Sequence, residues 1–286
     1  MIGNYLLSGR MQAVIAVTLS SLLSFLLQPF AFLICGSVIG LITLRKGIHS
    51  AIQTLLISFI VLQIFFIVLS TSSYINTIII LVIWLPVLFL SAVLRLTRSQ
   101  GALILFSGLI SIILTIIFYV LVGDVAAWWQ DYLTKVFETT APSQQIQAYN
   151  KLLESNADLI NAMIFAAYTL NMVTGVLFAR WWQSRLFNPG GFQKEFYGLN
   201  IPIILLPVFI IIGVLAFNAN EPWQDMCRDV LIILTFTYLI QGISFLHRTV
   251  HRLKLSVGWL VFLYFALIFL PQMALIVACL GIVDAF

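Results

Sequence analysis

Long apolar runs separated by short polar bends dominate this sequence. A helix needs about 20 mainly apolar residues to cross the hydrocarbon core of a bilayer. The pattern predicts nine such spans, at 11–27, 30–44, 48–69, 76–94, 101–122, 159–181, 201–218, 229–246 and 257–283. Backbone groups in lipid must be satisfied within a helix or a closed barrel, so we expect an all-α, polytopic membrane helix bundle.

The first apolar stretch, 11–44, is too long for one ordinary span. As a single helix it would measure about 51 Å at about 1.5 Å per residue, whereas the bilayer core is about 30 Å thick. Gln28 and Pro29 lie near its middle, and proline both removes a backbone donor and disfavours helix at the preceding residue. We expect two short spans joined by a tight turn, with one kinked or re-entrant unit as the alternative.

Composition supports lipid as the solvent. Hydrophobic residues make up 62% of the chain, charged residues only 8%, and the mean hydropathy is +1.10. Soluble domains carry about 25% charged residues. The net charge of +4 is spread over span ends and not clustered on one face, so we expect no nucleic-acid partner.

The charged residues also predict an orientation. The nine spans place most of the basic residues on one side: Arg10, Arg45, Lys46, Arg95, Arg98, Arg180, Arg185, Lys194, Arg248, Arg252 and Lys254. The positive-inside rule assigns that side to the cytoplasm. We therefore expect a multi-pass protein of the bacterial inner (cytoplasmic) membrane, with a cytoplasmic N-terminus and a periplasmic C-terminus.

Residues 123–158 form the longest loop expected on the outer side. Its apolar residues recur at helical spacing: Val125, Trp128, Trp129, Tyr132, Leu133, Val136 and Phe137. This spacing predicts an amphipathic helix lying in the interface, with a second short helix after Pro142. The helix either packs on the bundle surface or covers an outward-facing cavity as a lid.

Signatures of catalysis and energy coupling are missing. The sequence contains no GxxxxGK[ST], HExxH or GxSxG motif. No charged residue is expected in the middle of a span, which disfavours a proton-driven carrier. The cysteines, Cys35, Cys227 and Cys279, lack metal-binding spacing. We expect no enzyme activity, no cofactor and no metal site.

Polar side chains on the spans are the best candidates for contact with a solute. They are Asn161, Tyr168, Asn171, Gln53, Tyr238 and Gln241. In span 159–181 the first three share one face of the helix with Gly175, within about 80° of arc. Such groups avoid lipid. They either hydrogen-bond between helices or line a pocket, free of fixed charge, for a small neutral or aromatic solute.

Two further segments are candidates for partner binding. Ala16, Ser20 and Ser24 form a small-residue row that lets another helix approach closely, either in the same chain or in a partner membrane protein. The inner loop 183–200 contains a turn followed by two phenylalanines four residues apart. These residues are Asn188, Pro189, Gly190, Gly191, Phe192 and Phe196.

The inner loop, the pair Gln241-Gly242 and the ending Leu280–Asp284 together resemble the YybS-like family of bacterial inner-membrane proteins. That family is distantly similar to the S components of energy-coupling-factor vitamin transporters. The resemblance implies one membrane domain, 1–286, with an S-component-like core in 1–182 and the inner loop and last three spans in 183–286. S components usually have six spans, and this chain departs from them in its expected nine.

Two functions follow as hypotheses. The first is a solute-binding or transport-related protein without its own energy source, which would rely on a membrane coupling subunit. The alternative is a membrane scaffold that recruits a cytoplasmic or membrane partner through loop 183–200. Both hypotheses require contact with the lipid bilayer, and the sequence does not identify the small-molecule ligand.

Overall fold

The structure, a computed structural model, describes residues 2–27, 30–69, 73–140, 143–220 and 223–286. Every regular element in these ranges is a helix, which confirms the all-α class. The helices form two compact units with alternating segments. Unit 1 is Met1–Ser107, Leu170–Ile201 and Ser244–Lys254, and unit 2 is Gly108–Thr169, Pro202–Ile243 and Leu255–Phe286. The S-component-like core that the resemblance implies for residues 1–182 stays a prediction.

Five helices in the described residues are long and apolar enough to cross a membrane by themselves. They are α4 (Ile48–Val68), α5 (Ser73–Thr97), α6 (Gln100–Val122), α8 (Ser143–Phe187) and α11 (Trp223–Arg252). Four apolar helices are shorter: α2 (Arg10–Leu26), α10 (Leu205–Asn218), α12 (Gly258–Phe269) and α13 (Gln272–Asp284). The expected count of nine spans is therefore not confirmed.

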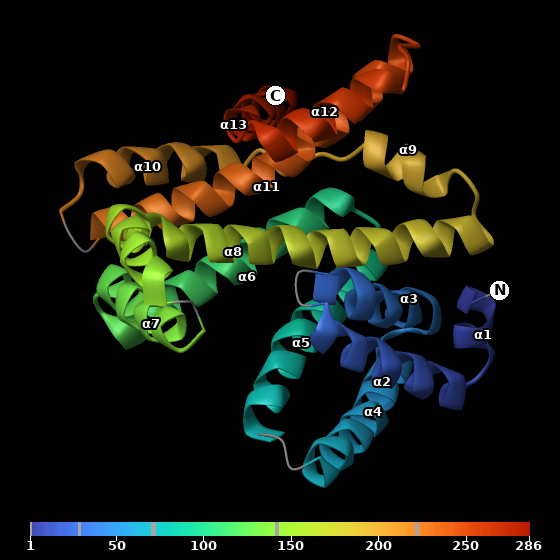
Figure 1. The fold of residues 1–286 in the computed structure, drawn as a ribbon. Coiled ribbons are helices and arrows are strands. Elements are labelled where there is room, and N and C mark those ends of the chain that lie inside the picture. The colour runs from blue at the N-terminus through green and yellow to red at the C-terminus, as the bar shows by residue number, and fades with distance from the viewer. Residues whose placement is uncertain (1, 28–29, 70–72, 141–142, 221–222) are drawn as a thin grey trace. The chain divides into compact units, whose positions relative to one another are not determined.

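The first apolar stretch consists of two helical arms in unit 1. After α1 (Ile2–Ser8), helix α2 forms the first arm, and η2 (Phe32–Gly36) continues into α3 (Ser37–Lys46) as the second. The expected turn at Gln28 and Pro29 lies outside the described residues. The Ser21 Oγ lies 3.2 Å from the Cys35 Sγ, so the second arm packs back along the first. Figure 1 shows α2 to α5 together in the blue-to-teal part of the ribbon.

The small-residue row of α2 lies mostly inside unit 1. Ser20 and Ser24 are buried, and Ala16 is half-buried. The Ser24 hydroxyl donates to the Ser20 carbonyl at 2.7 Å and also approaches the Ala31 carbonyl of the second arm at 3.3 Å. These contacts fit the interpretation that the row packs within its own chain.

The polar segment 123–158 differs in part from its prediction. The amphipathic helix is present as α7 (Val125–Thr140). The second short helix does not exist as a separate element, because the helix that begins at Ser143 continues without a break into the span, giving α8. Pro142 itself lies outside the described residues. No glycine or proline interrupts residues 143–174, and so nothing in that sequence ends the helix before the apolar region.

The last expected span, 257–283, is wrong as a single helix. It is divided between α12 and α13 at Leu270 and Pro271. Leu270 has an extended conformation, with φ −126° and ψ 90°. The ring of Pro271 disfavours helix at the preceding residue, and Pro271 then takes the N-cap position of α13, where its missing N–H costs nothing.

Helix α13 crosses α11 within unit 2 at a pair of glycines, Gly242 of α11 and Gly281 of α13. A Cβ on Gly242 would collide with the carbonyl oxygen of Val277, and a Cβ on Gly281 would collide with that of Tyr238. The two backbones are therefore in direct contact, as in close helix crossings in membranes. The same crossing brings Asp284 to Gln241, with 3.5 Å between Oδ2 and Nε2.

Candidate functional site

A buried carboxylate in α11 connects four helices of unit 2. Asp229 is 1% exposed, and its Oδ2 accepts a hydrogen bond from Asn161 Nδ2 of α8 at 2.6 Å. The same oxygen accepts from the Tyr119 hydroxyl of α6 at 3.1 Å. The Asn161 Oδ1 accepts in turn from the indole N–H of Trp129 in α7 at 3.1 Å. We call Trp129, Asn161, Asp229 and Tyr119 the Asp229 network.

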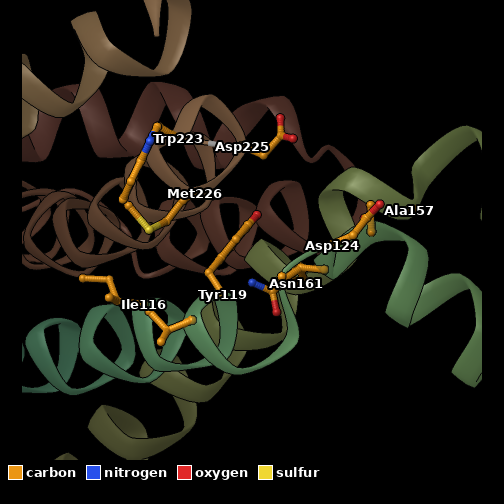
Figure 2. Close-up of a pocket in the computed structure, with 12 residues that line it drawn as sticks. Ile116, Tyr119, Asp124, Ala157, Asn161, Trp223, Asp225 and Met226 are labelled. Carbon is orange, nitrogen blue, oxygen red and sulfur yellow. The ribbon is translucent and has the colours of Figure 1, made fainter. Parts of the chain in front are cut away.

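The network borders a cavity of about 690 Å³. The residues that line it are Ile116, Tyr119, Val120, Gly123, Asp124, Val125, Ala126, Ala157, Asn161, Trp223, Asp225 and Met226. They come from the end of α6, the turn into α7, α8 and the start of α11, so we call it the α6–α11 cavity. Figure 2 shows Tyr119 extending from α6 toward α11, with Asn161 beside it.

The electrostatic character of this cavity differs from the expected neutral lining. Asp124 and Asp225 are both lining residues, and the described lining contains no lysine or arginine. Asp124 Oδ1 accepts from the backbone N–H of Ala127 at 2.9 Å, which caps the start of α7. Asp225 pairs with Arg228 at 3.3 Å, and both side chains are well exposed. A solute in the cavity therefore meets fixed negative charge.

The six predicted solute-facing residues are divided between the two units. Among them only Asn161 lines the α6–α11 cavity. Tyr168, Tyr238 and Gln241 also belong to unit 2, whereas Gln53 and Asn171 belong to unit 1. Tyr238 and Gln241 are buried beside the crossing with α13, and Gln53 accepts from Arg10 at 2.6 Å. A role for any of these residues in binding a solute stays a prediction.

Neither Asp229 nor Tyr119 was predicted from the sequence as a site residue. Asp229 was only the first residue of the expected span 229–246. In the structure Asp229 lies within α11 and is buried. One signal was available: the helical period of 3.6 residues puts Asp229 on the same face as Ile233 and Ile240, which are both buried.

Helix α7 packs on its own unit through the aromatic face that the sequence predicted. The ring of Trp128 lies edge-on to that of Phe118 in α6, with 5.1 Å between centroids. It also stacks on Tyr132 at 5.3 Å. The start of α7 also lines the cavity. A function of the helix as a lid stays a prediction.

The inner loop of unit 1 folds onto the end of α11. Helix α9 (Gly191–Tyr197) follows the turn, and Gly190 adopts the left-handed φ of 81° that glycine permits. Phe192 and Phe196 stack at 5.8 Å, and Phe196 lies edge-on to His247 at 5.6 Å. Both phenylalanines are half-buried, so their rings are already in contact with the chain itself.

The turn at 188–191 depends on one serine of α8. The Ser184 hydroxyl donates to the Asn188 carbonyl at 2.7 Å and accepts from the Phe192 N–H at 2.9 Å. We expect Ser184→Ala to destabilise the turn by about 1 kcal/mol, because the partly buried Phe192 N–H loses its partner and the Asn188 carbonyl keeps only the Gly191 N–H. Hydrogen–deuterium exchange should rise in residues 188–197. Thr174→Ala, which removes an exposed hydroxyl from the same helix, should leave that exchange unchanged.

The class of protein follows from these observations. Helices that can cross a bilayer, with exposed apolar surfaces such as those of α4 and α12, define an integral membrane protein in contact with lipid. The chain belongs to the family described as "Predicted membrane protein (DUF2232)", which it matches over residues 12–285. Neither the curated proteins nor the solved structures gave a match. The likeness to the YybS-like family and to S components stays a prediction.

Proposed function

We propose that this membrane protein binds a small, positively charged solute in the α6–α11 cavity, in a transport-related role. One observation carries the proposal: Asn161 and Tyr119 line the cavity and both hydrogen-bond to the buried Asp229. An ionisable group buried within a membrane helix is costly and marks a functional site by default. A solute that reaches Asn161 and Tyr119 would therefore contact two members of the Asp229 network directly.

The charge and shape of the cavity support a cation as the solute. Asp124 and Asp225 supply negative charge, and Tyr119 and Trp223 supply aromatic rings on which a cation can lie. The remaining lining is largely apolar, which suits an organic ion that buries hydrocarbon along with its charge. A volume of about 690 Å³ is within the range of small-molecule sites.

Binding, and not catalysis, is the activity that we propose. The described lining includes no serine, cysteine, histidine or lysine. Its titratable side chains are engaged within the chain, because Asp124 caps α7, Asp225 pairs with Arg228 and Tyr119 donates to Asp229. The sequence carries no P-loop, so energy for any transport would come from a partner subunit, as the resemblance to S components implies. The positive-inside rule would place the cavity, at the end of α6 and the start of α11, on the outer side of the bacterial inner membrane.

The direct test is a search for the solute on the purified protein. Native mass spectrometry should detect a co-purifying small molecule, and a panel of organic amines should raise the thermal midpoint more than neutral or anionic analogues do. A protein that is consistently empty and does not respond to cations would contradict the proposal. A response confined to anions would contradict the solute class.

A variant of one lining residue tests the site itself. We expect Asp225→Asn to weaken cation binding about five- to tenfold, because it removes a carboxylate from the lining and affects only an exposed ion pair otherwise. Titration by calorimetry gives the dissociation constants. The matched control is Asp131→Asn, which breaks the exposed pair with Lys135 on α7 but removes no lining residue. Equal losses in the two variants would mean that binding depends only on general surface charge.

The contacts of loop 183–200 support the scaffold hypothesis less well than the solute-binding hypothesis. The scaffold hypothesis needs the ring faces of Phe192 and Phe196 to be available to a partner. These rings stack on each other, and Phe196 also contacts His247. A partner at this loop would have to displace contacts that the chain already makes, whereas a solute in the α6–α11 cavity would not.

A further inference from the structure

Four arginines surround a second cavity, which lies in unit 1 and has a volume of about 360 Å³. Arg45 comes from the last turn of α3, Arg95 from the end of α5, Arg98 from the residue after α5, and Arg180 from α8. Glu195 of α9 is the one acidic residue in the lining, which leaves four positive charges against one negative charge. We call this the arginine cavity.

Three of the four guanidinium groups are held in place by neighbours. Arg95 Nη1 donates to the carbonyls of Thr43 and Leu44 at 2.9 and 3.2 Å, at the C-terminal end of α3. Arg180 forms a two-pronged ion pair with Glu195. Arg45 lies over the ring of Phe187, with 4.1 Å from Cζ to the centroid. The side chains are thus positioned before any anion arrives, which lowers the entropy cost of binding one.

The fourth arginine is different. The Arg98 guanidinium has no hydrogen-bond or ion-pair partner in the part of the chain that the structure describes. Its backbone has a φ of 54°, a left-handed conformation that costs energy in residues other than glycine. Arg98 therefore adds a further positive charge to a cavity that is already positive.

From this arrangement we infer that the arginine cavity binds a phosphate group. Planar guanidinium groups match the geometry of phosphate oxygens and bind them with paired, charge-assisted hydrogen bonds. A phosphate also offsets the mutual repulsion of Arg45, Arg95 and Arg98, which a neutral ligand cannot do. Glu195 neutralises Arg180 only, so three guanidinium groups are left for the ligand.

The phosphate has two possible sources, a lipid headgroup and a free soluble phosphate. The arginines lie at the ends of apolar helices, the level at which phospholipid headgroups lie. A soluble phosphate would reach the same groups from the aqueous side. The proposal is independent of the solute in the α6–α11 cavity, since the two cavities share no lining residue.

The experiment compares two probes on the full-length protein. Inorganic phosphate is titrated into protein in phosphate-free detergent solution, and phosphatidylglycerol adducts are measured by native mass spectrometry after mixing with lipid. Binding of both probes, or of inorganic phosphate alone, identifies a site open to free phosphate. Binding of phosphatidylglycerol alone identifies a headgroup site. The absence of binding with both probes would overturn the inference.

Variants tie the binding to the cavity. Arg98→Asn should weaken the affinity for the probe that binds by about tenfold, because one charge-assisted contact is lost. Asparagine tolerates the left-handed backbone at this position. Arg252→Asn is the matched control, an exposed arginine outside the lining, and should change affinity less than about twofold. Glu195→Gln should have the opposite effect and strengthen binding, because it frees Arg180. Equal losses for Arg98→Asn and Arg252→Asn would overturn the inference.

Discussion

Asn161→Ala should lower the free energy of unfolding by about 3 kcal/mol, one of the largest effects of a single side chain in this protein. The substitution removes the 2.6 Å donor of Asp229 and the acceptor of Trp129. A buried carboxylate that loses a hydrogen-bond donor keeps its full desolvation cost, which exceeds the worth of an ordinary hydrogen bond. Thermal midpoints and denaturant titrations in detergent would measure the loss.

A double-mutant cycle separates this network effect from simple loss of volume. Asp229→Asn removes the charge that needs the donor, so the double variant should be more stable than the sum of the single losses predicts, by about 1–2 kcal/mol. Thr174→Ala, at an exposed position on the same helix, should cost less than about 0.5 kcal/mol. Strict additivity of Asn161→Ala and Asp229→Asn would show that the two side chains are not coupled.

The second large effect is expected at the helix crossing. Gly242→Ala should destabilise the protein by about 3 kcal/mol, because the new methyl group meets the Val277 backbone and α13 has to move away from α11. Side chains can rotate out of a collision, whereas a carbonyl oxygen in a helix cannot. The loss would be measured as a lower thermal midpoint and as faster hydrogen exchange in α13.

A matched glycine provides the control for this crossing. Gly213 lies inside α10, and its added Cβ would find only Leu231 Cδ1, at an ordinary 3.8 Å. Gly213→Ala should therefore be neutral or stabilising by about 0.5–1 kcal/mol, through helix propensity. If Gly242→Ala were equally harmless, α13 could not cross α11 at the place described.

The elements of the fold that depend on local periodicity were predictable from the sequence. The helices α4, α5 and α6 begin and end within three residues of the expected spans, and α7 appears with its aromatic face. The break at Pro271 was missed because the apolar run is continuous in composition, although the proline itself was visible. A hydropathy pattern counts apolar residues and does not register the local conformation of Leu270.

The candidate site was predictable only in part, because it depends on contacts between distant residues. Asn161 was singled out by its place on an apolar helix, but its partner Asp229 lies 68 residues away and Tyr119 lies 110 residues from Asp229. Nothing in a single sequence pairs such positions. Gly242 was noted only as part of a motif. The reason that this position must be glycine is the opposing backbone of α13, which only the structure shows.

The division into α12 and α13 has a consequence for the surrounding lipid. At about 1.5 Å per residue these helices measure about 18 and 20 Å, less than the hydrocarbon thickness of about 30 Å. Because α12 carries exposed Phe262, Phe265 and Ile268, lipid beside it would meet an apolar surface shorter than the hydrocarbon core. We expect this mismatch to thin the bilayer locally and to favour shorter-chain phospholipids around this edge of the protein.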